Sequence, residues 1–296
     1  MNPVVLYFAS GESFYAGACL AVLSVILSGY LKGPWSSRLR NLVAWLGLVL
    51  MVMARPPFSW TVDAISAAAF VVWLAATNRW LRWPLWRPLP GAVLCIVLLA
   101  LVVIELPHRQ MPVIVGVPSD HLVVIGDSIS SGIDSHVPAW PNFMRQRTNV
   151  PVRNLSRAGA QTAEIQDMVS NVSSDDRVVL IEIGGNDLLG DVPSVVFEKN
   201  LDAALSGLVT PGRTIVMFEL PLLPTKISYG QIQRRLAAKY AVWLIPKRCF
   251  ADVIRGADAT SDGLHLSETG ARRMATLVAT LLSPLLKSEM VGANKQ

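Results

Sequence analysis

Four short blocks of polar and glycine residues, spread over the C-terminal two-thirds of the chain, contain the residue types that acyl-transfer chemistry needs. In chain order they are Gly126-Asp127-Ser128, residues 154–159, residues 184–187 and residues 262–265. A serine attacks an ester efficiently only when a base takes its proton and pre-aimed donors stabilise the charge on the carbonyl oxygen. Each block alone is weak evidence. Their occurrence together, in this order, is the stronger signal.

Ser128 is the candidate nucleophile. It follows an apolar run, residues 121–126, which we expect to be a buried strand. The alternative is that Ser128 only caps the helix that follows, as serines often do. The presence of the other three blocks favours catalysis over capping. Ser130 and Ser131 lie nearby but lack the position at the end of the strand.

His265 is the candidate base, and Asp262 is the carboxylate expected to orient it. A spacing of three residues places both side chains on one turn ahead of the final expected helix. A single loop can then offer the imidazole to Ser128 while the carboxylate holds the other ring nitrogen. An isolated Asp-His pair in a loop would usually be only a solvated pair, so this assignment depends on the other blocks.

The four blocks resemble those of the SGNH hydrolases, the subgroup of the Gly-Asp-Ser-Leu lipase family defined by Ser, Gly, Asn and His. The resemblance covers roughly residues 120–286, and the one visible departure is the conservative replacement of the usual Leu by Ile129. It implies an oxyanion hole built from the backbone amides of Ser128 and Gly159 and the side-chain amide of Asn186.

The resemblance also implies supporting roles for three polar residues. Asp127 and Asp187 are rival carboxylates for the histidine, but the family uses them to brace loops. Asn154 is expected to fix its own loop rather than contact substrate. The alternative for residues 184–187 is an ordinary turn, to which glycine and asparagine are well suited. Neither a cofactor nor a metal ion is implied.

Apolar runs alternate with helix-like stretches between the blocks. Strands are expected at residues 121–126, 152–155, 177–183, 214–220 and 241–245, and helices at 141–148, 163–169, 194–208, 231–240 and 267–286. This alternation predicts an α/β fold with a doubly wound parallel sheet, of the flavodoxin-like form that the SGNH resemblance implies. Sites in such sheets form outside the carboxyl ends of the strands, where three of the blocks fall.

The part of the chain before the blocks has the composition of a membrane protein. Hydrophobic residues make up 52% of the whole chain, charged residues 16%, and the mean hydropathy is +0.44. We expect an all-α transmembrane region of about four helices, at residues 14–31, 41–56, 60–77 and 89–106. The second is long enough only if Arg40 and Arg55 reach opposite interfaces.

The expected domains are a transmembrane region at residues 1–106, a proline-containing linker at 107–119, a hydrolase domain at 120–288 and a tail at 289–296. Residues 1–110 contain eight Lys or Arg and three Asp or Glu, whereas residues 111–296 contain 18 of each. The basic charge therefore belongs to the membrane flanks. This distribution argues against a nucleic-acid partner, which requires a basic face on a folded domain.

The same charges predict an orientation. The expected loops 32–40 and 79–88 hold six Lys or Arg residues, and the alternate connections hold only Arg55 and Arg109. Positive charge in short loops stays in the cytoplasm. We therefore expect an integral protein of the bacterial inner (cytoplasmic) membrane with its hydrolase domain on the periplasmic or extracellular side. If residues 42–54 were re-entrant instead, the catalytic part would be cytoplasmic.

Two enzymatic functions fit the blocks. The first is an esterase or deacylase that removes acyl groups, including acetyl groups, from lipids or envelope glycans. The second is an acyltransferase that passes the acyl group to a sugar or lipid hydroxyl. A non-enzymatic alternative, a membrane anchor with an inactive hydrolase fold, is disfavoured because every catalytic position is occupied. Apolar residues at 188, 189, 222 and 223 are expected to line an acyl pocket or to belong to the core.

Overall fold

The computed structural model describes residues 2–30, 33–54, 56–78, 88–133, 136–222 and 224–287. Contacts divide them into two compact units. A helical unit comprises residues 7–110 together with 222–227, and a catalytic unit comprises the described residues of 1–6, 111–221 and 228–296.

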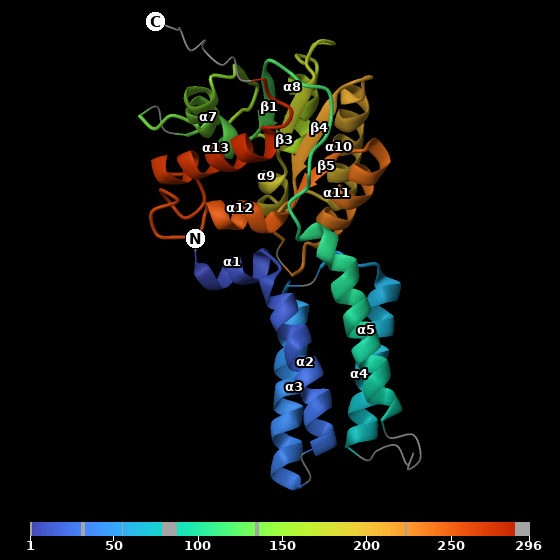
Figure 1. Ribbon diagram of the computed structural model, residues 1–296. Coiled ribbons are helices and arrows are strands. Elements are labelled where there is room, and N and C mark those ends of the chain that lie inside the picture. Colours follow the sequence, from blue (N-terminus) through green and yellow to red (C-terminus); the bar gives the residue numbers. More distant parts are fainter. Residues whose placement is uncertain are drawn as a thin grey trace, which may run out of the picture. The chain divides into compact units, whose positions relative to one another are not determined.

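The helical unit contains four helices that are long and apolar enough to cross a membrane. They are α2 (Glu12–Tyr30), α3 (Pro34–Ala54), α4 (Trp60–Thr77) and α5 (Leu89–Glu105), preceded by the short helix α1 (Pro3–Ala9) and followed by a 3₁₀ turn at Leu106–His108. Figure 1 shows α2 beside α3 and α4 beside α5, as the contacts between these pairs require. The four expected apolar segments are therefore helical.

Helix α3 begins earlier than expected. Residues 34–40 were expected to lie in a loop, but they form the first turns of α3. Proline is favoured at the start of a helix, and the hydroxyl groups of Ser36 and Ser37 both donate to the carbonyl of Gly33, at 2.9 Å each. The loop prediction was wrong because these polar residues, read alone, resemble a connection.

Hydrogen bonds of Arg40 stabilise this polar turn of α3. Its guanidinium donates to the side-chain oxygens of Asn41, at 2.8 Å, and of Asn78, at 2.9 Å, and only 5% of the residue is exposed. Asn78 is the residue that ends α4. The charge is thus satisfied within the helical unit rather than by extension away from it. Arg55, its expected counterpart, lies outside the described residues.

Small residues let α2 and α3 approach each other closely. A Cβ atom added to Gly17 would lie 2.5 Å from the carbonyl oxygen of Gly47, and one added to Gly47 would lie 2.7 Å from that of Gly17. Neither position has room for a side chain. This is the small-residue contact typical of helices in membranes, where close backbone approach maximises dispersion attraction.

The catalytic unit is built on a five-stranded sheet in the order β2-β1-β3-β4-β5, with every neighbouring pair parallel. The strands are β1 (Leu122–Gly126), β2 (Val152–Asn154), β3 (Val178–Glu182), β4 (Thr214–Phe218) and β5 (Trp243–Ile245). All residues of β1, β3 and β4 are buried, as expected for strands covered on both faces. The predicted doubly wound α/β fold is confirmed.

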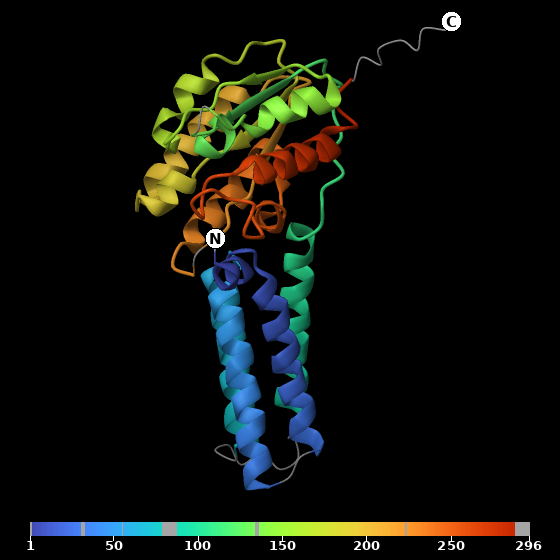
Figure 2. The same cartoon turned by 90° about the vertical axis from the view of Figure 1, so that its left-hand side faces the viewer.

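Helices cover both faces of the sheet. On one face α7 (Trp140–Thr148), α12 (Lys247–Val253) and α13 (Glu268–Leu282) share a core with side chains from β1, β3 and β4. Figure 2 shows α7 and α13 in front of the strands. On the other face lie α8 (Ile165–Val169), α10 (Ser194–Leu208) and α11 (Ile227–Tyr240) (Figure 1). The short helices α6 (Ser128–Ser131) and α9 (Gly185–Leu189) and a 3₁₀ turn at Thr162–Glu164 complete the unit.

The segment expected to be a linker is partly incorporated into the catalytic unit. Ile114 is buried in the core, and the backbone of Ser119 bonds to that of Leu285 at 2.7 Å and of Lys287 at 2.9 Å. The boundary between units, after residue 110, falls inside the expected linker. The domain limits at residues 106, 119 and 288 stay a prediction, and the expected tail lies outside the described residues.

The glycine contact between α2 and α3 predicts a selective effect on stability. Replacing Gly47 by Val should push the helices apart and lower the stability of the helical unit by about 1 to 3 kcal/mol, the usual penalty of overpacking. The midpoint of thermal unfolding in detergent measures this. The matched control is Gly29→Val on α2, where an added Cβ meets nothing within 4 Å. An unchanged midpoint for Gly47→Val would contradict the close contact.

Candidate active site

Ser128 is the first residue of α6 and follows a sharp turn at the end of β1. Gly126 ends the strand, and a Cβ there would lie 2.6 Å from the carbonyl oxygen of Glu182, so no side chain fits. Asp127 caps α6, because its carboxylate accepts a hydrogen bond from the amide of Ile129 at 2.9 Å. The capping role that was the alternative for Ser128 therefore belongs to its neighbour.

The Asp262–His265 pair is formed within one loop ahead of α13. One carboxylate oxygen of Asp262 lies 2.6 Å from His265 Nδ1, and the other accepts the amides of Leu264 at 2.9 Å and His265 at 2.8 Å. Gly263 makes the turn with a φ of +90°. The bond to His265 and these amides hold the pKa of the Asp262 carboxyl well below its usual range. The carboxylate is thus ionised. It contacts Nδ1, so Nε2 is the imidazole nitrogen that it leaves available.

The candidate nucleophile and the candidate base line the same cavity. Ser128 and His265 both line a cavity of about 200 Å³ in the catalytic unit. Its remaining walls are mainly apolar and come from α6, the segment before α7, α7 itself and the start of α13. They include Ile129, Ile133, Val137, Pro138, Trp140, Leu266 and Ala271. The fold thus brings the first and last blocks, 137 positions apart in the sequence, to one hollow.

The two middle blocks supply the other candidate oxyanion donors. Gly159 has a φ of +76°, and nothing lies within 4 Å of the place where its Cβ would stand, so its backbone faces open space. Asn186, in the first turn of α9, donates one hydrogen of its amide to the carbonyl of Ala160 at 3.0 Å. An amide NH₂ carries two hydrogens, so one remains for a substrate. The bond also fixes the side chain against the loop that contains Gly159.

The supporting residues connect these loops to one another. Asn154 donates from its side chain to the carbonyl of Ser130 at 2.8 Å, which ties the second block to the short helix that begins at Ser128. Asp187 is fully buried and accepts the amide of Thr162 at 2.9 Å and its hydroxyl at 2.5 Å. Burial raises the pKa of Asp187, although the two hydrogen bonds from Thr162 favour its charged form. Both contacts are of the bracing kind that the resemblance implied.

Glu182, at the end of β3, was not anticipated from the sequence. Its carboxylate accepts the hydroxyl of Ser130 at 2.8 Å, and that hydroxyl in turn accepts the indole N–H of Trp140 at 3.1 Å. The carboxyl group of Glu182 is also close enough to that of Asp127 for their charges to interact. The signal that could have revealed it is a single acid at the end of a continuous apolar strand.

Burial controls the ionisation of this acid pair. It raises the pKa of Asp127 to about 6 and, together with the charge of Asp127, raises the pKa of Glu182 well above its usual value. Both shifts favour the protonated forms, so the two acids resist ionising together. Asp127 caps the helix that begins at Ser128, and Glu182 accepts from Ser130 in that helix, so this pairing limits negative charge next to Ser128.

The leucines expected to line an acyl pocket or to belong to the core differ in their exposure. Leu188 and Leu222 are buried, Leu189 is 57% exposed, and Leu223 lies outside the described residues. The cavity beside Ser128 is lined by other apolar side chains.

His121 immediately precedes β1 and lies 2.7 Å from a carboxylate oxygen of Asp176. The hydrogen bonds to Asp176 and Asp120 outweigh burial and raise its pKa.

Comparisons with known proteins identify the class and then the family. An arylesterase of Vibrio mimicus is 28% identical over 179 residues, which cover 54% of this chain and 87% of that protein. The sequence model of the GDSL-like Lipase/Acylhydrolase family matches residues 124–273, half of the chain. The protein is an ester hydrolase. It belongs to the GDSL-like lipase/acylhydrolase family.

Solved structures of similar fold include two bacterial enzymes. Esterase EstA from Pseudoalteromonas sp., in a structure inhibited by monoethylphosphonate, is 17% identical, with 56% of this chain and 100% of that chain covered and a TM-score of 0.47. The lipase/acylhydrolase from Enterococcus faecalis is 20% identical, with 58% and 100% covered and a TM-score of 0.47.

The buried acid pair predicts an unusual pH dependence of stability. In the unfolded chain these acids have ordinary pKa values of 3.8 and 4.5, whereas both values are raised in the folded protein. The folded state therefore binds more protons between about pH 4 and pH 6, and stability falls as pH rises through that window, by about 1.4 kcal/mol per pH unit for each retained proton. Glu182→Gln should weaken this fall, because it removes one of the two buried acids whose pKa is raised in the folded protein.

The midpoint of thermal unfolding between pH 4.5 and 7.5 measures the effect. Glu198→Gln is the control, since Glu198 is a partly exposed acid in a surface ion pair with Arg235. An identical pH dependence for Glu182→Gln and the unaltered protein would show that Glu182 retains no additional proton in the folded state.

Proposed function

We propose that the protein is a membrane-anchored serine esterase or deacylase that acts through Ser128, His265 and Asp262. The observation that carries the proposal is the 2.6 Å contact between Asp262 and His265 Nδ1 in a loop that shares a cavity with Ser128. The carboxylate fixes the imidazole tautomer with its proton on Nδ1. Nε2 is then the nitrogen that takes the serine proton.

The reaction proceeds through an acyl-enzyme. Ser128 Oγ forms a bond to the acyl carbon while its proton passes to His265 Nε2, and the resulting imidazolium stays paired with Asp262. Collapse of the tetrahedral intermediate breaks the ester C–O bond, and His265 returns the proton to the departing alcohol. Water then repeats the sequence, with His265 taking its proton, and releases the carboxylic acid and the free serine.

The charge on the tetrahedral oxygen is stabilised by donors that are already positioned. The amides of Ser128 and Gly159 and the second amide hydrogen of Asn186 serve this purpose. Because Asn186 is held by Ala160, at 3.0 Å, its orientation does not have to be organised during the reaction. All these donors are neutral, so none competes with the histidine for Asp262.

The substrate is an acyl ester of a lipid or of an envelope glycan, and acetyl esters are included. Four candidate membrane-spanning helices support an integral membrane protein. The expected loops 32–40 and 79–88 hold six of the eight Lys and Arg residues before residue 111, and this asymmetry supports a bacterial inner membrane with the catalytic unit on its periplasmic or extracellular side. The relation to an arylesterase makes aryl esters suitable probes.

The second candidate function is acyl transfer to a sugar or lipid hydroxyl through the same acyl-enzyme. The apolar walls around Ser128 and His265 favour acyl transfer, because they limit the access of water to the ester. Product analysis with p-nitrophenyl acetate and increasing glycerol distinguishes the two. A hydrolase releases acetate regardless of glycerol, whereas a transferase forms glycerol acetate in proportion to it.

The nucleophile is tested with p-nitrophenyl esters from acetyl to palmitoyl and with a fluorophosphonate label. Ser128→Ala should abolish both hydrolysis and labelling because it removes the only atom that forms the acyl bond. Ser131→Ala, on the same short helix, is the matched control and should retain both. Labelling of the Ser128→Ala protein at the unaltered rate would refute the assignment.

Asn186 is tested by steady-state kinetics on the same esters. Asn186→Ala should lower kcat by about 10² to 10³, or about 3 to 4 kcal/mol, with a smaller change in KM, because the lost donor acts mainly in the transition state. Asn171→Ala, whose side chain is exposed and bonds only to the carbonyl of Asp167 among the described contacts, should leave kcat unchanged. A loss confined to KM would instead place Asn186 in ground-state binding.

A further inference from the structure

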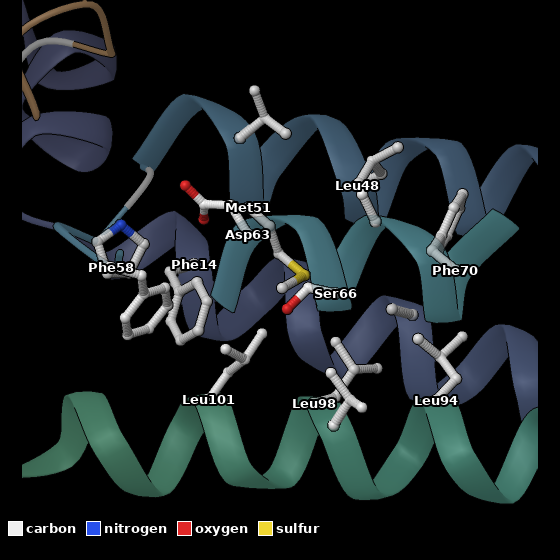
Figure 3. Close-up of a pocket in the computed structure, with 15 residues that line it drawn as sticks. Phe14, Leu48, Met51, Phe58, Asp63, Ser66, Phe70, Leu94, Leu98 and Leu101 are labelled. Carbon is white, nitrogen blue, oxygen red and sulfur yellow. The ribbon is translucent and has the colours of Figure 1, made fainter. Parts of the chain in front are cut away.

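The helical unit contains a cavity of its own. Its volume is about 280 Å³, and its walls come from α2, α3, α4 and α5 and from the connection before α4. Figure 3 shows leucines of α5 on one side and residues of α3 and α4 on the other. The lining residues are Phe14, Ala21, Leu48, Met51, Val52, Pro56, Phe58, Asp63, Ser66, Ala67, Phe70, Leu94, Val97, Leu98 and Leu101.

The walls of the cavity are suited to hydrocarbon. Only Asp63 and Ser66 among the lining residues have polar side chains, and the Ser66 hydroxyl donates to the carbonyl of Val62, one turn back in its own helix, at 2.7 Å. The interior therefore presents no set of donors and acceptors that could order water or a polar ligand. An apolar space of this size stays dry or takes an apolar ligand.

The length of the cavity suits a hydrocarbon chain. Along α5 the lining runs from Leu94 to Leu101, which at 1.5 Å per residue is a length of about 10 Å. A segment of a single linear hydrocarbon chain fits this length.

The exposure of residues along α5 distinguishes this cavity from the outer surface of the helices. Leu94, Leu98 and Leu101 are at most 4% exposed, whereas their neighbours Leu99 and Ile96 are 64% and 67% exposed. Exposed residues on a membrane span meet lipid tails in any case. The cavity is a recess between the helices, so a chain within it would be held from several sides.

We propose that this recess binds one acyl chain of a membrane lipid. The inference rests on the proposed membrane location, which makes hydrocarbon the medium around all four helices. The bound chain fills the space between the α2–α3 pair and the α4–α5 pair and joins the two pairs by dispersion contacts. Asp63, in the first turn of α4, makes the adjacent part of the recess unfavourable for an anionic headgroup.

Two adjacent alanines on α4 provide a matched test. Ala67 lines the recess and Ala68 does not, and both are exposed, so a larger side chain displaces no packed residue at either position. Ala67→Trp should fill the recess, whereas Ala68→Trp should leave it open. The full-length proteins are reconstituted in dioleoylphosphatidylcholine vesicles that contain a phosphatidylcholine with a diazirine in its acyl chain, and lipid adducts are mapped by mass spectrometry after illumination.

The expected result is adduct formation on recess residues such as Leu98 and Met51 in the unaltered protein and in Ala68→Trp, with loss of these adducts in Ala67→Trp. Adducts on the outward residues Ile96 and Leu99 should be equal in all three proteins. Recess adducts that persist in Ala67→Trp, or adducts on outward residues alone, would overturn the inference. So would a protein–protein cross-link at the recess, which would indicate a partner chain there.

Flotation of the same vesicles separates this inference from the proposed function. Protein that floats with the vesicles but has no recess adducts disproves the lipid site and leaves the membrane location intact. Protein that does not float overturns the membrane location and the lipid site together. Hydrolysis of p-nitrophenyl acetate, measured in parallel, shows that each variant retains a folded catalytic unit.

Discussion

Gly126 at the end of β1 pairs with Glu182 at the end of β3, and the other candidate catalytic groups are placed by this junction. The strands are parallel neighbours at the position where the strand order changes direction, so their carboxyl ends open at the same edge. The turn after β1 carries Ser128 and the turn after β3 carries Asn186. Without a side chain at Gly126 the ends of β1 and β3 approach closely, so the turns that carry Ser128 and Asn186 begin at the same edge of the sheet.

Acids near the nucleophile differ in charge because they differ in burial. Asp262 is half-exposed and accepts bonds from His265 and two amides, so it remains ionised. Asp127 and Glu182 are buried, so burial raises the pKa of both and both resist ionisation. The histidine therefore has one anionic partner in its own loop. The buried pair provides mechanical support through Ser130 and Trp140 with little negative charge that would oppose the oxyanion.

Much of the fold follows from local patterns in the sequence. Apolar runs that end at glycine predicted β1 and β3 to within a residue or two, because strands buried on both faces are continuous in hydrophobicity. The candidate site could be predicted because Ser128, Gly159, Asn186 and His265 each need a residue type that few others can replace. Glu182 was missed because its partners, Asp127 and Ser130, are more than 50 positions away in the sequence.

Features that depend on distant partners are those that the sequence did not reveal. The first turns of α3 look like a loop until Asn78, from the end of α4, is placed beside Arg40. The recess in the helical unit arises from the spacing between helix pairs, which no single apolar segment encodes. Local hydropathy specifies that these segments are helical and apolar, and tertiary contacts decide which of their faces meet.

The most direct test of the convergence of the four blocks is a crystal structure of the protein inhibited by a phosphonate monoester. The phosphonyl group should be bonded to Ser128 Oγ, with its oxygen about 3 Å from the amide of Gly159 and from Asn186 Nδ2. His265 should face the position left by the departing group, with Asp262 still at its Nδ1. A phosphonate bonded to a different residue, or a phosphonyl oxygen that points away from Gly159 and Asn186, would contradict a shared site.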